Sequence, residues 1–477
     1  MEKYGQRFQN SRLFTQKDII SSNINMLLSQ KYSYVILILG ALIIGSLIVV
    51  SSNLIILPFL ASLVLLFIIK PHIGLYTIFL TDIWFSYHEG PISRRTIILF
   101  FVVSIYMIYF FYKKKFKIDK KVNYIVYTIF VLLLWGLFTD FLINKVPLKN
   151  FYASFARLWL PVLIALLLYF FIEKEKHLDK FIYIIIFGVS ISGLIGILQF
   201  FWGGVFYDIV PRPENMNISS GVIFGLSGMP HIYASQLAST IPLILSIILS
   251  QHKFRKILLI SFAILTIALI LTFVRSAIYG CTIGIITLFL FRLKKKIAIK
   301  INILIVILLL LFSVLSGMTE HGKRLFQVEG SALGRIPLAI SAFYIAKDNP
   351  FGVGRGKYTE EVEEYLWQLK RFEYYHVVTV TTPHNQFLNV LVYWGIPGFL
   401  LLLFFYYKIL KQVNIIRKTT NNEYLKTLSI GLFCSYIAYI INSLFHNNGA
   451  FTGDPFHWYF IGLTFCLIKL TIYNKRP

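Results

Sequence analysis

The feature that most constrains this chain is a series of long apolar blocks along most of its length. An α-helix needs about 20 apolar residues to cross the roughly 30 Å of hydrocarbon in a bilayer, and many blocks reach that length. Of the 477 residues, 57% are hydrophobic, which is more apolar surface than a soluble core of this size buries. We therefore expect an all-α polytopic membrane protein with about 14 transmembrane helices, and no fewer than about 12.

The candidate spans are placed at the centres of the apolar blocks. The blocks near residues 79 and 161 are the weakest, because Asp82 and Arg157 interrupt them. No small-residue cleavage site follows the first block, so no removable signal peptide is expected. The centres lie near residues 42, 61, 79, 104, 132, 161, 191, 241, 265, 284, 308, 395, 436 and 463.

The formal charge of +25 does not indicate nucleic acid, because the basic residues form short clusters between apolar blocks. Cytoplasmic loops of membrane proteins carry an excess of lysine and arginine. Placing both termini in the cytoplasm puts most of these residues on the inner side, so we expect that orientation and a lipid bilayer as the partner. The clusters are residues 113–121, 251–256, 292–300 and 408–418.

This topology divides the chain into four segments. Residues 1–33 form a cytoplasmic N-terminal segment, 34–316 the first eleven spans, 317–383 one large extracytoplasmic helical loop, and 384–477 the last three spans. Two loop helices are expected. Residues 337–347 begin with a proline, which suits a first turn, and residues 359–372 carry acids first and bases last, which matches the helix dipole. In the second, Val362, Tyr365, Leu366, Leu369 and Phe372 share one face, which we expect to lie on the membrane or on the bundle.

Cationic side chains meet on the outer side of this topology. Arg275 lies at an outer turn, Arg335 opens the first loop helix, and Arg157 and Arg212 belong to earlier outer segments. One guanidinium group can donate two parallel hydrogen bonds to two oxygens of a phosphate. Burying an arginine at membrane depth costs free energy unless its side chain faces a cavity or an anion. A lipid-linked phosphate or pyrophosphate is the natural ligand. The alternative is that Arg275 snorkels from a helix end and Arg335 pairs with Glu329.

His384 and Asn385 follow the loop directly, at the start of an apolar helix. One interpretation is structural, with Asn385 capping free amides. The other is chemical: a neutral imidazole accepts the proton of a sugar hydroxyl while the arginines stabilise the departing phosphate. His446 and Asp454 lie on the last outer turn, where they contact the glycan or only solvate the turn.

Metal chemistry has little support in the sequence, so we expect no metal and no cofactor. No Asp-x-Asp pair and no His/Cys cluster at ligand spacing occurs, and the nearest acids on an outer turn are Asp82 and Glu89. The three cysteines, Cys281, Cys434 and Cys466, lie inside apolar blocks and are interpreted as small buried hydrophobic residues.

Four stretches resemble the O-antigen ligase and polymerase superfamily of polytopic glycan transferases. They are "GLSGMPHIYASQLASTIPL" (225–243), "LTFVRSAIYG" (271–280), "GRIPLAISAFYIAKDNPFGVGRG" (334–356) and "HNQFLNVLVYWGIPGFLLLL" (384–403). The resemblance covers roughly residues 180–410, with Val274 where the family usually has serine. It implies that Arg275 and Arg335 contact a donor pyrophosphate and that His384 activates the acceptor hydroxyl. It further implies a metal-independent, inverting glycosyltransferase in the bacterial cytoplasmic membrane.

Three classes of function stay open. The first is transfer of a polyprenyl-pyrophosphate-linked glycan to an acceptor glycan. Such an enzyme is either a polymerase of surface polysaccharide repeats, with a chain-length regulator as a further partner, or an O-antigen ligase acting on a lipid A-core acceptor. The second is a lipid-linked oligosaccharide flippase or transporter, which usually carries ionisable groups near the membrane midplane. The third is a non-enzymatic binding or assembly factor. We expect the polymerase, because in this superfamily that role occurs in both kinds of bacterial envelope.

Overall fold

The structure is a computed structural model that describes residues 71–84, 118–146, 148–209, 222–250, 254–317, 335–355, 382–446 and 456–473, with single positions at 357, 358, 360–362, 365 and 451. Side chains of 148–157 lie outside the description. Contacts divide the chain into two compact units, Met1–Thr81 and Asp82–Pro477. In the first, only the beginning of one helix is described; the following account concerns the second.

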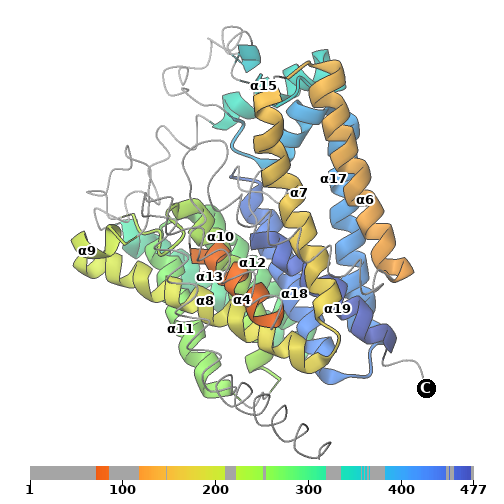
Figure 1. Cartoon of the computed structure of the whole chain (residues 1–477). Helices are drawn as coiled ribbons and strands as arrows, with labels where there is room; N and C mark the ends of the chain where they lie inside the picture. Colours follow the sequence, from red (N-terminus) through yellow and green to blue (C-terminus); the bar gives the residue numbers. More distant parts are fainter. Residues whose placement is uncertain are drawn as a thin grey trace, which may run out of the picture. The chain divides into compact units, whose positions relative to one another are not determined.

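All regular elements among the described residues are helices. The six that are long and apolar enough to cross a membrane are α6 with η1, α8, α10, α12, α17 and α18, which makes this a membrane protein. The larger number of spans stays a prediction, and the blocks near residues 42, 61 and 104 lie outside the described residues. In chain order the helices are α4 (Pro71–Trp84), α6 (Lys120–Leu137), the π-helical turn η1 (Phe138–Ile143), α7 (Leu148–Phe171), α8 (Glu175–Trp202), α9 (Gly204–Tyr207), α10 (Pro230–Ile248), α11 (Arg255–Leu271), α12 (Arg275–Arg292), α13 (Lys295–Gly317), α15 (Arg335–Asp348), α17 (Gln386–Thr419), α18 (Glu423–Ser443) and α19 (Phe456–Tyr473) (Figure 1).

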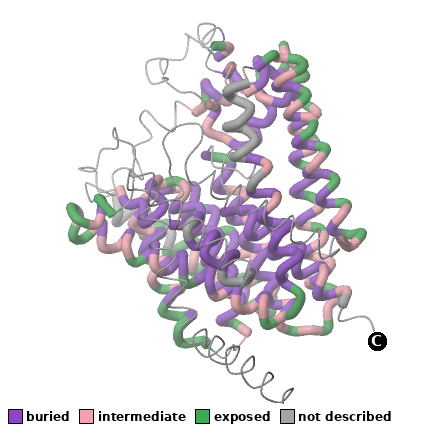
Figure 2. Tube along the Cα trace, viewed as in Figure 1, coloured by how far each residue is buried: buried purple, intermediate pink, exposed green. Residues whose placement is uncertain are grey.

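Helices α10, α12 and α18 pack side by side at the centre of the second unit (Figure 1). Small residues bring the backbones of α12 and α18 together: a Cβ on Gly280 would lie 2.4 Å from the carbonyl oxygen of Ala438. At one end of this pair Ser276 Oγ donates a hydrogen bond of 2.8 Å to Asn442 Oδ1. Since low numbers in α12 meet high numbers in α18, the two helices are antiparallel. Figure 2 shows that α10 and α18 are buried along most of their length.

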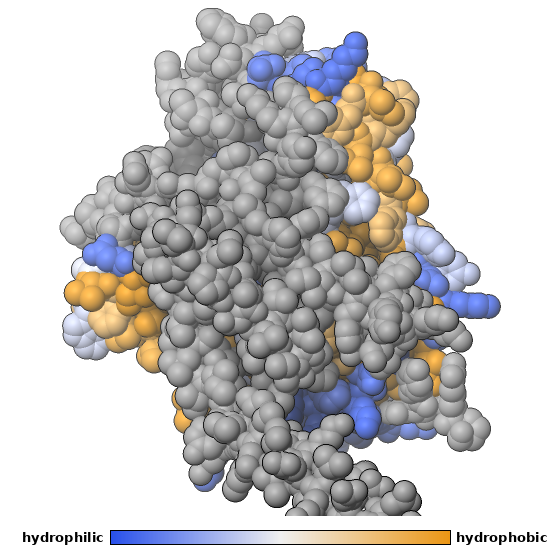
Figure 3. Space-filling model, viewed as in Figure 1, coloured by the Kyte–Doolittle hydropathy of each residue, from blue (hydrophilic) through white to orange (hydrophobic). Residues whose placement is uncertain are grey.

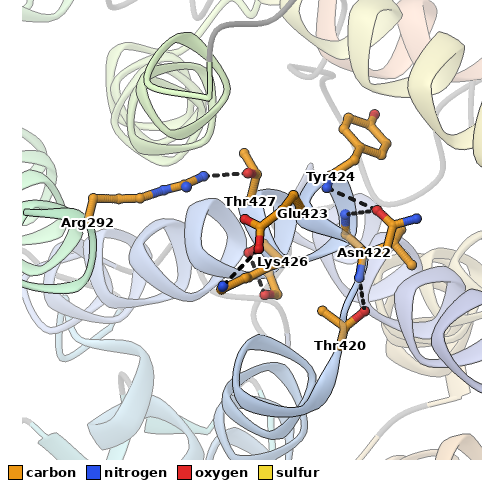
Figure 4. A network of polar contacts seen from close by, with 9 residues as sticks. Arg292, Thr420, Asn422, Glu423, Tyr424, Lys426 and Thr427 are labelled. Carbon is orange, nitrogen blue, oxygen red and sulfur yellow. Dashed lines mark hydrogen bonds and ion pairs between the residues drawn. The ribbon is translucent and has the colours of Figure 1, made fainter.

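The opposite end of the same three helices is basic. Arg292, the last residue of α12, donates from Nη2 to Thr427 Oγ1 near the start of α18 (Figure 4). Ser246 of α10 donates to the carbonyl oxygen of Thr427, so α10 ends there too. Asn422 caps α18 by accepting from the amides of Tyr424 and Leu425. The basic residues of the adjoining helix ends and connections are Arg255, Lys256, Lys294, Lys295, Lys296, Arg417, Lys418 and Lys426.

Helix α17 is broken at Gly395, which has φ 68° and ψ −167°. The chain turns back there, so that Gln386 Nε2 donates to Tyr406 Oη at 3.1 Å although 20 residues separate them. Two arms result, residues 386–394 and 396–419. The expected helix after His384 is therefore present within a candidate membrane span, and the structure adds a break at Gly395 that the sequence analysis did not predict. Asn385 caps the first arm as expected, accepting from the amides of Phe387 and Leu388.

The connection after α15 braces this break. The carbonyl oxygen of Pro350 accepts from the amide of Ile396 at 2.8 Å, and the amide of Val353 donates to the carbonyl oxygen of Val392 at 2.9 Å. Arg355 then fixes the connection to the bundle: its amide donates to Asp140 Oδ1 at 3.0 Å and its Nη2 to the carbonyl oxygen of Phe451 at 2.6 Å.

Both expected loop helices can be compared with the structure. The first corresponds to α15, with Pro337 in its first turn. Of the second, only single positions are described. Val362 and Tyr365 are buried in a cluster with Ala342 of α15 and Leu391 of α17, so this apolar face contacts the bundle.

The side of α6 that faces away from the bundle is apolar. Figure 3 shows hydrophobic surface over this helix. A surface of this kind on a span suits contact with lipid acyl chains. The exposed hydrophobic residues of α6 and of η1, which continues it, include Tyr124, Tyr127, Val131, Leu134, Phe138 and Leu142.

Candidate functional site

A cavity of about 290 Å³ lies at the end of α10, α12 and α18 that is opposite the basic end. Its cationic and titratable lining residues come from separate elements: His231 is the second residue of α10, Arg275 begins α12, Arg335 begins α15 and His446 follows α18. Two guanidinium and two imidazole groups thus face one space. The remaining lining residues are Val222, Pro230, Thr272, Phe273, Val274 and Ser276.

A tight turn between α11 and α12 presents Arg275. Thr272 Oγ1 accepts from the amide of Val274 at 3.2 Å, and Phe273 has φ 51°, a left-handed conformation that is uncommon for a side chain with a Cβ. The turn places Arg275 in the first turn of α12, one residue before Ser276. The antiparallel contact of α12 with α18 therefore holds this guanidinium near the end of α18.

Arg335 is the electrostatic centre of the site. Burial, followed by the repulsion of Arg275, lowers its pKa, yet a guanidinium stays charged in proteins. The same charge acts on His384 and His446 and lowers the pKa of each. Arg335 is therefore close enough to interact both with Arg275 and with these imidazoles.

His231 and His446 form a stacked pair. Their ring centroids are 4.2 Å apart and their planes differ by 31°. His231 has an exposed side chain that faces the cavity, whereas only 4% of the surface of His446 is accessible. Burial, followed by His231, Arg335 and His384, lowers the pKa of His446 well below its usual value, so its imidazole is neutral at neutral pH.

His384 lies beside the cavity and is not one of the residues that line it. Its φ of 51° is left-handed, and strained backbone of this kind is held in place only by surrounding structure. Asn385, directly after it, caps the first arm of α17. Burial, followed by Arg335, lowers the pKa of His384, which leaves a neutral imidazole able to accept a proton.

The charge of the cavity favours an anion. None of its described lining residues is a carboxylate, and two of them are permanently cationic. Across the part of the chain that is described, no group of three or more His, Cys, Asp or Glu residues has the arrangement of a metal site. The arrangement therefore suits a phosphate group, because one guanidinium can donate two parallel hydrogen bonds to two of its oxygens.

The remaining residues predicted from the sequence are not among the described residues that line the cavity. Arg157 lies within α7, but its side chain is outside the description, and Arg212, Asp454 and Glu89 lie outside the described residues. Asp82 is buried and accepts a hydrogen bond from Tyr459 Oη at 3.1 Å.

The sequence analysis did not single out His231. A signal was present, because Pro230-His231 and Pro383-His384 are both Pro-His pairs at the start of a helix. Its significance depends on the stacking with His446, more than 200 positions later in the chain, which no local pattern encodes.

Residues 259–403 match the O-antigen ligase family (Wzy_C). The matched segment begins inside α11 and ends inside α17, and it contains Arg275, Arg335 and His384. His231 and His446 lie on either side of it in the sequence. No curated protein matches the chain in sequence. The earlier resemblance to this superfamily is thus confirmed, and members of the family are glycosyltransferases of the ligase and polymerase type.

Proposed function

We propose that this protein transfers a glycan from a polyprenyl-pyrophosphate carrier to the hydroxyl of an acceptor glycan, and that it polymerises surface polysaccharide repeats. The observation that carries the proposal is one cavity in which Arg275 and Arg335 come together without a lining carboxylate, next to a neutral His384. The match to the O-antigen ligase family supports the same reaction class.

The proposed reaction is a single displacement. The acceptor oxygen bonds to the anomeric carbon as the bond from that carbon to the pyrophosphate oxygen breaks, so the configuration inverts. The acceptor proton passes to the imidazole of His384, and the electron pair of the broken bond stays on the pyrophosphate, beside Arg275 and Arg335. No step requires a metal ion, because guanidinium groups supply the positive charge.

The charge distribution supports an outward-facing site. The basic end of α10, α12 and α18 is the end that the positive-inside rule places in the cytoplasm. The cavity lies at the other end of the same helices. We therefore propose that the donor binds at the outer face of the cytoplasmic membrane, with both termini inside.

Purified protein and a lipid-linked oligosaccharide provide the test, with glycan growth followed on a gel. We expect His384→Ala and Arg275→Ala each to abolish turnover, whereas Arg255→Ala, an exposed arginine at the opposite end, retains it. Unchanged turnover in both site variants would show that the roles are wrong.

The acceptor decides between polymerase and ligase, since both need the same donor site. In cells without this protein, a polymerase function predicts loss of long surface polysaccharide while single repeats are retained. Loss of all attached glycan, including single repeats, would indicate a ligase that uses a lipid A-core acceptor.

A further inference from the structure

The His231–His446 pair is the part of the cavity that the proposed transfer step does not use. Two features set it apart from the arginines: an imidazole changes charge near neutral pH, and these two rings lie 4.2 Å apart. Two imidazolium ions at that separation repel each other, so in the empty cavity the pair cannot carry two protons at neutral pH.

The charged and titratable groups that the structure describes around the pair are two arginines and one further histidine. Arg335 comes from α15, Arg275 from the start of α12, and His384 from the chain before α17. Each of the two histidines also faces the other, His231 from α10 and His446 from the end of α18. Among the described residues that line the cavity, no carboxylate offsets a further positive charge.

A bound diphosphate diester counters the positive electrostatic potential at the two histidines. It brings two negative charges into a space of about 290 Å³, and an opposite charge within about 4–6 Å of a titratable group favours its charged form. A neutral imidazole offers one N–H donor, whereas an imidazolium offers two. Binding of the anion and protonation of the pair therefore favour each other.

Resting on the proposed function, we infer that the His231–His446 pair is a second, proton-coupled half of the diphosphate site. It takes up a proton from solution when the donor binds, and one of the two neighbouring rings holds the added positive charge. His384 stays neutral, as a proton acceptor must. When the carbon–oxygen bond breaks, the leaving pyrophosphate gains one negative charge, and the charged pair lies beside it.

The probe for a test is a water-soluble donor analogue, a short-chain prenyl diphosphate esterified to one sugar. Both of its phosphates are diesters and fully ionised at neutral pH, so any proton taken up belongs to the protein. Calorimetric titration of the full-length protein at pH 7.5, in two buffers of different ionisation enthalpy, counts the protons bound per ligand. We expect an uptake of up to about one proton.

Substitutions of the two histidines test whether the proton that is taken up binds to this pair. His231→Gln and His446→Gln are expected to lower the uptake and to weaken the gain in affinity for the probe as the pH falls. His231 is exposed, so its variant tests the inference even if His446→Gln does not fold. His177→Gln, a half-buried histidine of α8, is the matched control and retains the uptake, as does His384→Gln.

The outcomes separate the two proposals. Uptake that falls in His231→Gln and persists in His177→Gln supports the inference. Binding of the probe without uptake, or with an uptake that His231→Gln leaves unchanged, overturns the inference and leaves the donor site in place. A wild-type protein that does not bind the probe at all overturns the proposed function and this inference together.

Discussion

Gly395→Ala tests the break in α17, whose first arm directly follows His384 and Asn385. A Cβ at this position would lie 2.2 Å from the carbonyl oxygen of Pro350 and 2.5 Å from the carbonyl carbon of Phe351. Both are backbone atoms of a braced connection, so neither can move aside like the end of a flexible side chain. The left-handed φ of 68° adds a cost of roughly 1–2 kcal/mol for alanine.

Overpacking of a tight contact typically costs a further 1–3 kcal/mol, roughly, so we expect a total loss of about 2–5 kcal/mol. Gly204→Ala is the matched control, because Gly204 also has a positive φ, 29°, but a Cβ there meets nothing within 4 Å. The assay is the temperature at which purified protein in detergent loses its monodisperse state. Equal temperatures for the two variants would refute the packing of residues 350–354 against the break in α17.

The remaining predictions concern other contacts and the pH dependence. Gly280→Ala is expected to destabilise the protein by about 1–3 kcal/mol in the same assay, since its Cβ would meet the carbonyl oxygen of Ala438 at 2.4 Å. Arg355→Ala removes the hydrogen bond to the carbonyl oxygen of Phe451. Limited proteolysis of the connection between α15 and α17 should then become faster, whereas an unchanged rate would mean that Arg355 does not hold this connection in place. In pH profiles of kcat/KM for the donor, which report on the free protein, the acid limb is expected below pH 6.5, because the pKa of His384 is lowered and the rate is lost as pH falls through it. Arg335→Gln removes a charge that lowers this pKa, so any residual activity should show an acid limb shifted to higher pH.

Hydropathy predicted the helices well because span length is set by bilayer thickness and not by tertiary contacts. Each of the expected spans near residues 132, 191, 241, 284 and 436 corresponds to a helix of the structure that can cross a membrane. The break in α17 was not predictable in this way. Glycine and proline occur within transmembrane helices, so "WGIPG" in an apolar run does not by itself indicate a turn. The turn depends on contact with residues 350–354, which come from a different part of the chain.

The sequence predicted the charged residues of the candidate site, but it did not predict all of the residues that form it. Arg275, Arg335 and His384 could be singled out because charged and titratable groups stand out beside apolar spans. His231 could not, because its significance comes from the distant His446. The brace made by Arg355 was missed for the same reason, since its partners Asp140 and Phe451 lie on other elements.

The most direct test of the central claim is the position of the two phosphorus atoms of a donor analogue in an experimental density map of the complex. The account predicts both atoms in the cavity, with phosphate oxygens within hydrogen-bonding distance, about 2.7–3.2 Å, of the guanidinium groups of Arg275 and Arg335. It also predicts the sugar on the side of His384. Phosphorus density at the basic end, near Arg292, or anywhere away from these arginines would contradict it.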